Sequence, residues 1–229
     1  MPKNSISDRW DAIWLKNNQY SLYPRRVFKT EEKISDLVNF GIDFLGKKVL
    51  DAGCGDGAAL RYLQQNFQTT GCGIDISSGA IERAKAIEPT NMNTYQVADA
   101  RALPFSDQTF DVVLSWGVLT YFDEIEKAIS EARRVLKPDG LLIIVQPNLL
   151  SFGVMQEWYL RIKKRWPYGT HKKYSPFKFK HWLRRNGFSS VKFFAKPPYA
   201  DMPIAGVFDG ILNRIFPFWG HYLYIIARK

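Results

Sequence analysis

The sequence predicts an α/β fold built on a doubly wound, mostly parallel sheet of seven strands. Three observations predict it. Apolar runs alternate with amphipathic segments of helical length between residues 45 and 148. The first run, in VLDAGCGDG (residues 49–57), enters a turn with three glycines at alternate positions, and LLIIVQP (141–147) is apolar almost throughout. Strands that alternate with helices form parallel βαβ units, whose inner strands are covered on both faces.

The elements follow one another in a regular order. KKVLDA is a strand that runs into the glycine turn, and AALRYLQQNF after it has helical spacing. TTGCGIDI is a second strand, after which Ser77 or Ser78 is suited to cap the helix GAIERAKAIE, which stops before Pro89. NTYQVAD and TFDVVLSWG are the third and fourth strands. The helix EIEKAISEARRVLK then ends before Pro138 and leads to LLIIVQP.

Composition places the chain among folded globular proteins. It has 229 residues, of which 46% are hydrophobic and 15% aromatic, enough for one domain with a proper core. We expect no signal peptide in MPKNSISDRWDAIW and no membrane span, since no apolar stretch reaches about 18 residues. Two lone cysteines, Cys54 and Cys72, indicate a reducing, cytoplasmic location. We expect no metal site, because the cysteines and the three histidines lack ligand spacing.

A ligand site is expected at the carboxyl ends of the strands. Acids close the first three strands, at Asp51, Asp75 and Asp99, and Ser115 with Trp116 closes the fourth. Asp75 should stand beside the glycine turn, where a carboxylate can accept both hydroxyls of a ribose. Each acid alone could simply cap the turn that follows it. Three acids and a bare glycine turn together indicate a bound small molecule that contains a nucleoside.

Positive charge is concentrated near the C-terminal end. Residues 148–196 hold twelve Lys or Arg and one acid, whereas the whole chain has a net charge of +10. Such asymmetry indicates an anionic partner. Residues 158–185 could lie on an anionic membrane. Alternatively, the basic residues of 161–196 could line a channel for an acidic soluble substrate or hold RNA by its backbone. A solvated face is the fourth alternative.

These motifs resemble the class I S-adenosylmethionine-dependent methyltransferases of the small-molecule type. The resemblance rests on VLDAGCGDG, GIDIS, VADARALPF, FSDQTFDVVLSWGVLTYF and EARRVLKPDGLLIIVQPN, in that order, with Asp139 where the family often has a glycine. It covers residues 45–148 and implies the Rossmann-like methyltransferase fold. NGFSSVKFFA and HYLYIIARK look like the family's last two strands, an antiparallel pair at one edge of the sheet.

The resemblance also implies site residues and S-adenosyl-L-methionine as cofactor. Gly53, Cys54, Gly55 and Gly57 would form the backbone shelf beneath it. Asp51 would help to hold the methionine end, and Asp75 with Ile76 the ribose. Asp99 and the main chain of Ala100 would meet the adenine. Ser115, Trp116 and Gly117 would border the sulfonium and the acceptor.

We expect a single domain, residues 1–229. It comprises a helical cap (1–44), a cofactor-binding core (45–148) and lid insertions (149–175 and 197–220). The lids mix aromatic and polar groups, which suits a small, anionic or lipid-like acceptor methylated on O, N or C. His171 is our candidate general base, and Tyr121 the second candidate. The alternatives are a solvent-facing loop histidine and a packing tyrosine.

Other functions remain as alternatives at this stage. The fingerprint of an NAD-dependent oxidoreductase is Gly-x-Gly-x-x-Gly, and in this sequence Ala58 occupies the position of the third glycine. Asp51 and the later motifs disfavour it. A non-catalytic binding protein of the same fold is the second alternative. Nucleic acid is not expected as the acceptor, because SWGV stands where base-amino methyltransferases carry an Asn/Asp-Pro-Pro-aromatic run, and neither cysteine follows a proline.

Overall fold

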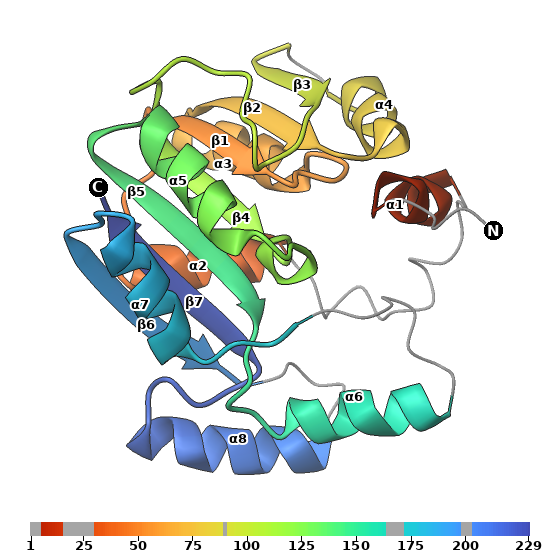
Figure 1. The fold of residues 1–229 in the computed structure, drawn as a ribbon, viewed down its shortest axis with the longest axis vertical. Helices are drawn as coiled ribbons and strands as arrows, with labels where there is room; N and C mark the ends of the chain where they lie inside the picture. Colours follow the sequence, from red (N-terminus) through yellow and green to blue (C-terminus); the bar gives the residue numbers. More distant parts are fainter. Residues whose placement is uncertain (1–5, 16–29, 89–90, 164–171, 198–202) are drawn as a thin grey trace.

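The computed structural model describes residues 6–15, 30–88, 91–163, 172–197 and 203–229. Within these ranges, seven strands form one sheet in the order β3-β2-β1-β4-β5-β7-β6 (Figure 1). The strands are β1 Lys48–Ala52, β2 Thr70–Asp75, β3 Asn93–Val97, β4 Phe110–Trp116, β5 Leu136–Pro147, β6 Ser190–Lys196 and β7 Tyr222–Arg228. β7 pairs antiparallel with β5 and β6, and the other pairs are parallel. This confirms the predicted fold class.

Helices cover both faces of the sheet. They are α2 Thr30–Asn39, α3 Ala58–Phe67, α4 Ser78–Ala86, α5 Ile125–Val135 and α7 Pro176–Arg185. One core cluster joins α5 and α7 to the sheet, and a second joins α2, α3 and α4 to its other face. In β5, Leu142 and Ile144 belong to the first cluster, whereas Ile143 and Val145 belong to the second. The strand is therefore apolar because neither face meets water.

Local signals set the helix boundaries. Ser77 is the N-cap of α4, and its hydroxyl accepts a hydrogen bond from the backbone N–H of Ala80 at 3.2 Å. Helix α3 begins directly after Gly57, whose φ of +77° ends the glycine turn. Ser175 caps α7 in the same manner as Ser77, with Pro176 in its first turn. These caps satisfy amide groups that a helix cannot bond internally.

Three further helices lie outside these layers. Helix α1, Ile6–Leu15, lies beside α4. Helices α6, Gly153–Ile162, and α8, Pro203–Ile215, lie together at one end of the molecule (Figure 1). Their position follows from the strand order, because the register brings Pro147, Lys196 and Tyr222 together. The segments that contain α6 and α8 therefore leave the sheet at the edge where the parallel strands end. In the described part of the chain, no helix has the length and apolar character of a membrane span.

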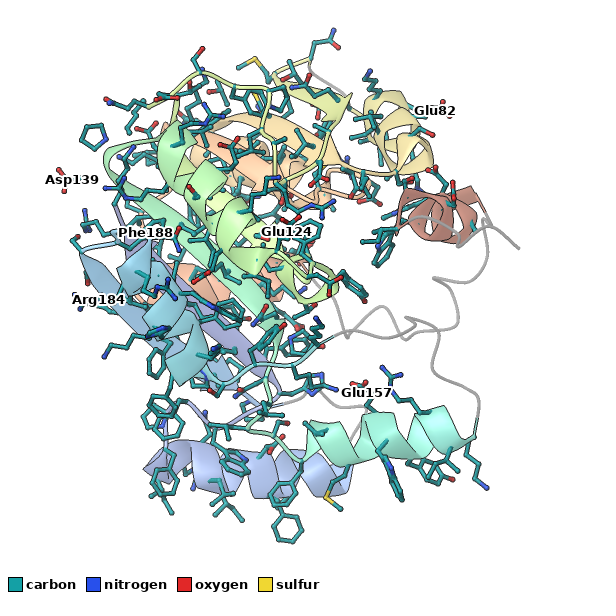
Figure 2. The ribbon with its side chains drawn as sticks, in the orientation of Figure 1. Glu82, Glu124, Asp139, Glu157, Arg184 and Phe188 are labelled. Atoms are coloured by element: carbon teal, nitrogen blue, oxygen red, sulfur yellow. The ribbon has the colours of Figure 1, made fainter. Side chains whose placement is uncertain are left out.

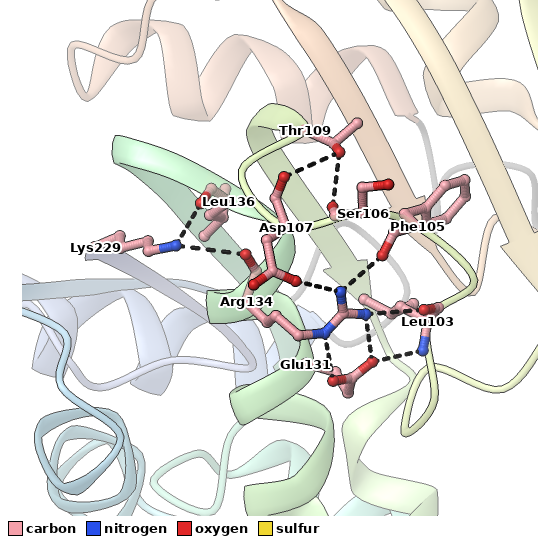
Figure 3. Close-up of polar contacts among 9 residues, drawn as sticks. All are labelled: Leu103, Phe105, Ser106, Asp107, Thr109, Glu131, Arg134, Leu136 and Lys229. Carbon is pink, nitrogen blue, oxygen red and sulfur yellow. Dashed lines mark hydrogen bonds and ion pairs between the residues drawn. The ribbon is translucent and has the colours of Figure 1, made fainter.

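Arg134 of α5 fixes the loop between β3 and β4 (Figure 3). Its guanidinium donates five hydrogen bonds of 2.7–2.9 Å, to both carboxylate oxygens of Glu131, to Asp107, and to the carbonyls of Leu103 and Phe105. Glu131 in turn accepts a hydrogen bond from the backbone N–H of Leu103 at 2.8 Å. Since a guanidinium has five N–H donors, every donor of Arg134 is used. The loop is thereby held against α5.

We expect the substitution Arg134→Met to lower the free energy of unfolding by about 2 kcal/mol or more, because each hydrogen bond to a charged group stabilises by about 1.5–3 kcal/mol. Urea unfolding measures the change. Lys137→Met is the matched control, since Lys137 makes an ion pair of 2.9 Å with Asp111 at the surface, worth about 1 kcal/mol or less. Equal losses in the two variants would contradict the role of Arg134.

Candidate functional site

The glycine turn is built from backbone in conformations that side chains disfavour. Gly53, Gly55 and Gly57 have φ values of +97°, +53° and +77°. Space is short as well: a Cβ at Gly53 would lie 2.1 Å from Cγ2 of Val118, and one at Gly57 would lie 2.7 Å from the hydroxyl oxygen of Tyr95. Both conformation and packing therefore require glycine at these two positions.

Hydrogen bonds tie this turn to the end of β2. The backbone N–H groups of Gly53 and Cys54 both donate to the carbonyl of Ile74, at 2.7 and 2.9 Å. The N–H of Gly55 donates to one oxygen of Asp75 at 3.0 Å, and that of Ser77 donates to the other at 3.0 Å. Burial raises the pKa of Asp75, and these backbone donors oppose the rise. The structure thus places Asp75 directly beside the turn.

Asp51 and Lys33 form a buried pair of opposite charges beneath the turn. Asp51 is 3% exposed, and its Oδ1 has no hydrogen-bond partner among the described residues. Burial, together with the charge of Asp75, raises the pKa of Asp51 to about 7, while Lys33 opposes the rise. Lys33 comes from α2, and burial lowers its pKa to about 8 against the effect of Asp51. Its Nζ lies 5.2 Å from the ring centroid of Trp116.

The sequence analysis did not identify Lys33 as a site residue, although its position on α2 could have indicated it. The lysine shares one face of α2 with Ile34 and Leu37, and all three are buried. A lysine on the apolar face of a short helix is unusual unless it is paired.

The two residues at the end of β4 face opposite sides of the sheet. Ser115 lines a small, mostly apolar cavity beneath α5 together with Ala52, Ala100 and Leu119. Trp116 is half-buried on the side of Lys33, and its Nε1 is buried without a hydrogen-bond partner among the described residues. Side chains of a strand alternate between faces, so only Trp116 shares its face with Asp51 and Lys33.

The end of β3 contains a contact that the sequence analysis did not foresee. Arg101 binds Asp99, with its Nη2 at 2.7 Å from Oδ2 and its backbone N–H at 2.8 Å from Oδ1. Partial burial raises the pKa of Asp99, but the hydrogen bonds from Arg101 outweigh this and hold it below its ordinary value. Ala100 is buried next to Asp99, and Ile76 is half-buried after β2. A ligand at Asp99 would share the carboxylate with Arg101.

Helix α1 contacts the rim of the site. Asp11 accepts hydrogen bonds from the hydroxyl of Ser77 at 2.6 Å and from the N–H of Gly79 at 3.2 Å, at the start of α4. Trp14 lies against Gly55, since a Cβ there would be 2.7 Å from its Cζ2. These contacts, which the sequence did not predict, bring α1 over the carboxyl ends of β1 and β2.

One of the two catalytic candidates can be placed. Tyr121 ends the short 3₁₀ helix η2, Leu119–Tyr121, and is half-buried. Its ring meets that of Trp10 edge to face, with centroids 5.2 Å apart. His171 lies outside the described residues.

The arrangement fits a molecule that joins a nucleoside to an amino acid. The turn offers bare main chain, and the start of α3 favours a carboxylate. Asp75 and Asp51 present carboxylate oxygens for hydroxyl and ammonium groups, and the orphaned Oδ1 of Asp51 is one acceptor that such a ligand would satisfy. In the described ranges, no group of three or more His, Cys, Asp or Glu side chains is placed to hold a metal ion.

Comparisons with known proteins agree with this description. The methyltransferase domain family matches residues 50–144. Malonyl-acyl-carrier-protein O-methyltransferase of Geobacter sulfurreducens is 31% identical over 202 residues, which cover 86% of this chain and 74% of that protein. The 2-methyl-6-phytyl-1,4-hydroquinone methyltransferase of Synechocystis is 38% identical over 113 residues. That alignment covers 47% of this chain and 35% of the relative, so the chain matches about a third of the relative's length.

Solved structures share this fold over most of the chain's length. The methyltransferase bound to the Trm112 activator of Haloferax volcanii aligns with a TM-score of 0.74 and 21% identity, covering 98% of this chain and 97% of the other. Other structures of this fold contain S-adenosyl-L-methionine or S-adenosylhomocysteine. Neither the oxidoreductase nor the non-catalytic alternative gains support from these matches. The chain belongs to the S-adenosylmethionine-dependent methyltransferases, a family whose cofactor is S-adenosyl-L-methionine.

Proposed function

We propose that this methyltransferase acts on a small, lipid-like acceptor. The observation that carries the proposal is the aromatic rim of the site. Trp10, Trp14, Trp116 and Tyr121 come from three separate segments and gather around the ends of β1 and β4. An apolar rim with few polar groups suits an apolar ligand. The name of the Synechocystis relative, a methyltransferase of a phytyl hydroquinone, supports an acceptor of this class.

We assign the cofactor contacts from the geometry of the strand ends. The glycine turn supports the cofactor, and Asp75 accepts hydrogen bonds from the ribose hydroxyls. Asp51 faces the ammonium group of the methionine part, while the start of α3 attracts its carboxylate. Asp99 and the main chain of Ala100 contact the adenine. Arg101 holds Asp99 ionised for that contact.

Positioning supplies most of the expected rate acceleration. The bound cofactor provides a methyl group already activated by a positively charged sulfur. The protein's task is to hold an acceptor atom in line with that group and to exclude water, which can contribute about 7–11 kcal/mol in well-oriented cases. The faces of Trp116 and Tyr121 favour a nearby positive charge. Tyr121 and His171 remain our candidates for removing a proton when the acceptor atom carries one.

A comparison of three acceptors tests the proposal. The methyl group of labelled S-adenosylmethionine is followed into a prenylated hydroquinone, the same hydroquinone without its prenyl chain, and a malonyl thioester. We expect transfer to the prenylated compound to be at least tenfold faster than to the other two. Preference for the malonyl thioester, or equal rates with and without the prenyl chain, would refute a lipid-like acceptor.

We expect Asp75→Asn to weaken S-adenosylmethionine binding about 100-fold, because two hydrogen bonds to a carboxylate, each worth about 1.5–3 kcal/mol, become weaker or are lost. Asp75→Ala should weaken it at least as much, since it also releases the N–H of Gly55. Titration calorimetry measures both affinities. Glu82→Gln is the control, because Glu82 is an exposed acid on α4. Unchanged affinity in the Asp75→Asn protein would refute the ribose assignment.

Cofactor affinity should depend on pH through Asp51. Its pKa of about 7 means that the carboxyl is mostly protonated at pH 6 and mostly ionised at pH 7.5. The ammonium group needs the ionised form, so affinity should rise about eightfold between these two pH values. Loss of the proton from Lys33, whose pKa is about 8, should also raise the cofactor affinity. A neutral Lys33 no longer competes with the cofactor's ammonium group for Asp51.

The isosteric variant Asp51→Asn provides the control for this pH dependence. Calorimetry at both pH values should give an affinity in that variant that is weaker and changes less with pH than in the wild type. A wild-type affinity that stays constant, or that falls as pH rises, would show that Asp51 does not contact the ammonium group.

A further inference from the structure

Helices α6 and α8, together with the residues directly beside them, carry most of the large apolar side chains that the described residues expose. Ten of the seventeen such side chains lie in residues 149–162 and 207–216, and Trp158, at 67% exposed, is the most exposed of them. The ten are Leu149, Met155, Trp158, Tyr159, Ile162, Val207, Phe208, Ile211, Ile215 and Phe216. A concentration of this kind marks an interaction surface in a soluble domain. We call it the α6–α8 platform.

Each helix presents these side chains as one stripe. On α6 they stand at positions 155, 158, 159 and 162, which is the helical spacing of one face. On α8 they stand at 207, 208, 211 and 215. The opposite faces hold buried acids, Glu157 on α6 and Asp209 on α8. In Figure 2, the labelled Glu157 projects from α6 toward the body of the protein, and other side chains of both helices extend away from it.

A buried carboxylate fixes the orientation of the two helices. Asp209, which is fully buried, accepts hydrogen bonds from the hydroxyl of Ser151 at 2.7 Å, the N–H of Phe152 at 3.0 Å and the indole N–H of Trp219 at 2.8 Å. The rings of Phe152 and Phe208 lie 5.7 Å apart across the junction. Because burial of an unpaired carboxylate is costly, rotation of α8 that broke these bonds is disfavoured. The apolar stripes are therefore held outward.

The charges on this surface have one sign. Across the described residues of 149–163 and 206–219, the exposed charged side chains are the basic Lys163 and Arg214. The acids of these segments, Glu157 and Asp209, are buried, and Glu157 is paired with Arg161 and Lys173. A second copy of the chain on a two-fold axis would place like charges opposite one another. An anionic lipid surface complements both the apolar stripes and their basic flanks.

We propose that the α6–α8 platform docks the protein on an anionic bilayer. The inference rests on the proposed lipid-like acceptor and deepens it by naming the surface that meets the lipid. Amphipathic helices of this composition lie in the headgroup region, bound by their apolar area and by attraction of basic side chains to anionic lipids. The platform and the proposed cofactor site lie toward the same edge of the sheet.

Vesicle flotation tests the proposal on the full chain. The wild type should float with vesicles of phosphatidylcholine and phosphatidylglycerol at low salt, and much less with phosphatidylcholine alone. Trp158→Gln with Ile211→Gln should lower the bound fraction per lipid at least tenfold, since glutamine keeps helix propensity but removes apolar area. Lys163→Gln with Arg214→Gln should lower it about fivefold per charge at low salt, and less at high salt. The matched control is Leu45→Gln with Ile87→Gln, which removes two exposed apolar side chains elsewhere and should float like the wild type.

Calorimetry with S-adenosylmethionine on each variant separates this proposal from the proposed function. Affinity should be unchanged in all of them, which also shows that they are folded. Absence of flotation in a wild type that binds the cofactor would overturn the platform proposal. Flotation of the Trp158→Gln and Ile211→Gln double variant equal to that of the wild type would also overturn it. A third such result is a dimer, seen by light scattering, that this variant disrupts while no protein floats with the vesicles. Transfer to a soluble acceptor only, with flotation intact, would instead count against the lipid-like acceptor.

Discussion

The attachment of the glycine turn to the end of β2 is the constraint on which the site depends. One carbonyl, that of Ile74, accepts from both Gly53 and Cys54, and Asp75 accepts from Gly55. These bonds are formed only if the chain turns sharply after β1, and the turn is sterically accessible only to glycine at its crowded positions. The same bonds set where α3 begins and where Asp75 points. The proposed cofactor shelf and Asp75, the proposed ribose ligand, are therefore parts of one hydrogen-bonded unit.

Features that depend on neighbouring residues could be predicted from the sequence. The strands follow from short apolar runs, the cap of α4 from Ser77 and the turn from its glycines, because each depends on a few adjacent residues. At position 139 the backbone conformation agrees with the family pattern although the residue type differs. The family resemblance leads to an expected glycine there, and the structure gives Asp139 a φ of +61°, a conformation that asparagine, aspartate and glycine tolerate best.

Contacts between segments that are distant in the sequence could not be predicted. The sequence places Lys33 on an apolar helix face, but its partner Asp51 is identified only when α2 packs against the sheet. Trp14 on Gly55 and Arg101 on Asp99 are contacts of the same kind. The basic residues of the segment 148–196 behave likewise, since the structure pairs some of their charges internally. The pairs are Lys173 with Glu157, Lys172 with Asp123 and Lys196 with Asp36. Net charge along a sequence therefore overstates the charge that a surface presents.

The antiparallel strand β7 explains why the cofactor site and the platform share one edge of the sheet. A parallel strand in that place would begin at the opposite edge, and the helix before it would lie far from the cofactor. Because β7 runs the other way, Tyr222 at its start pairs with Pro147 and Lys196 at the ends of β5 and β6. Helix α6 follows β5 and helix α8 precedes β7, so both emerge beside the carboxyl ends of β4 and β5. This is where we propose that the acceptor meets the methyl group. Reversal of one strand thus gives the fold room for an acceptor surface without disturbing the glycine turn.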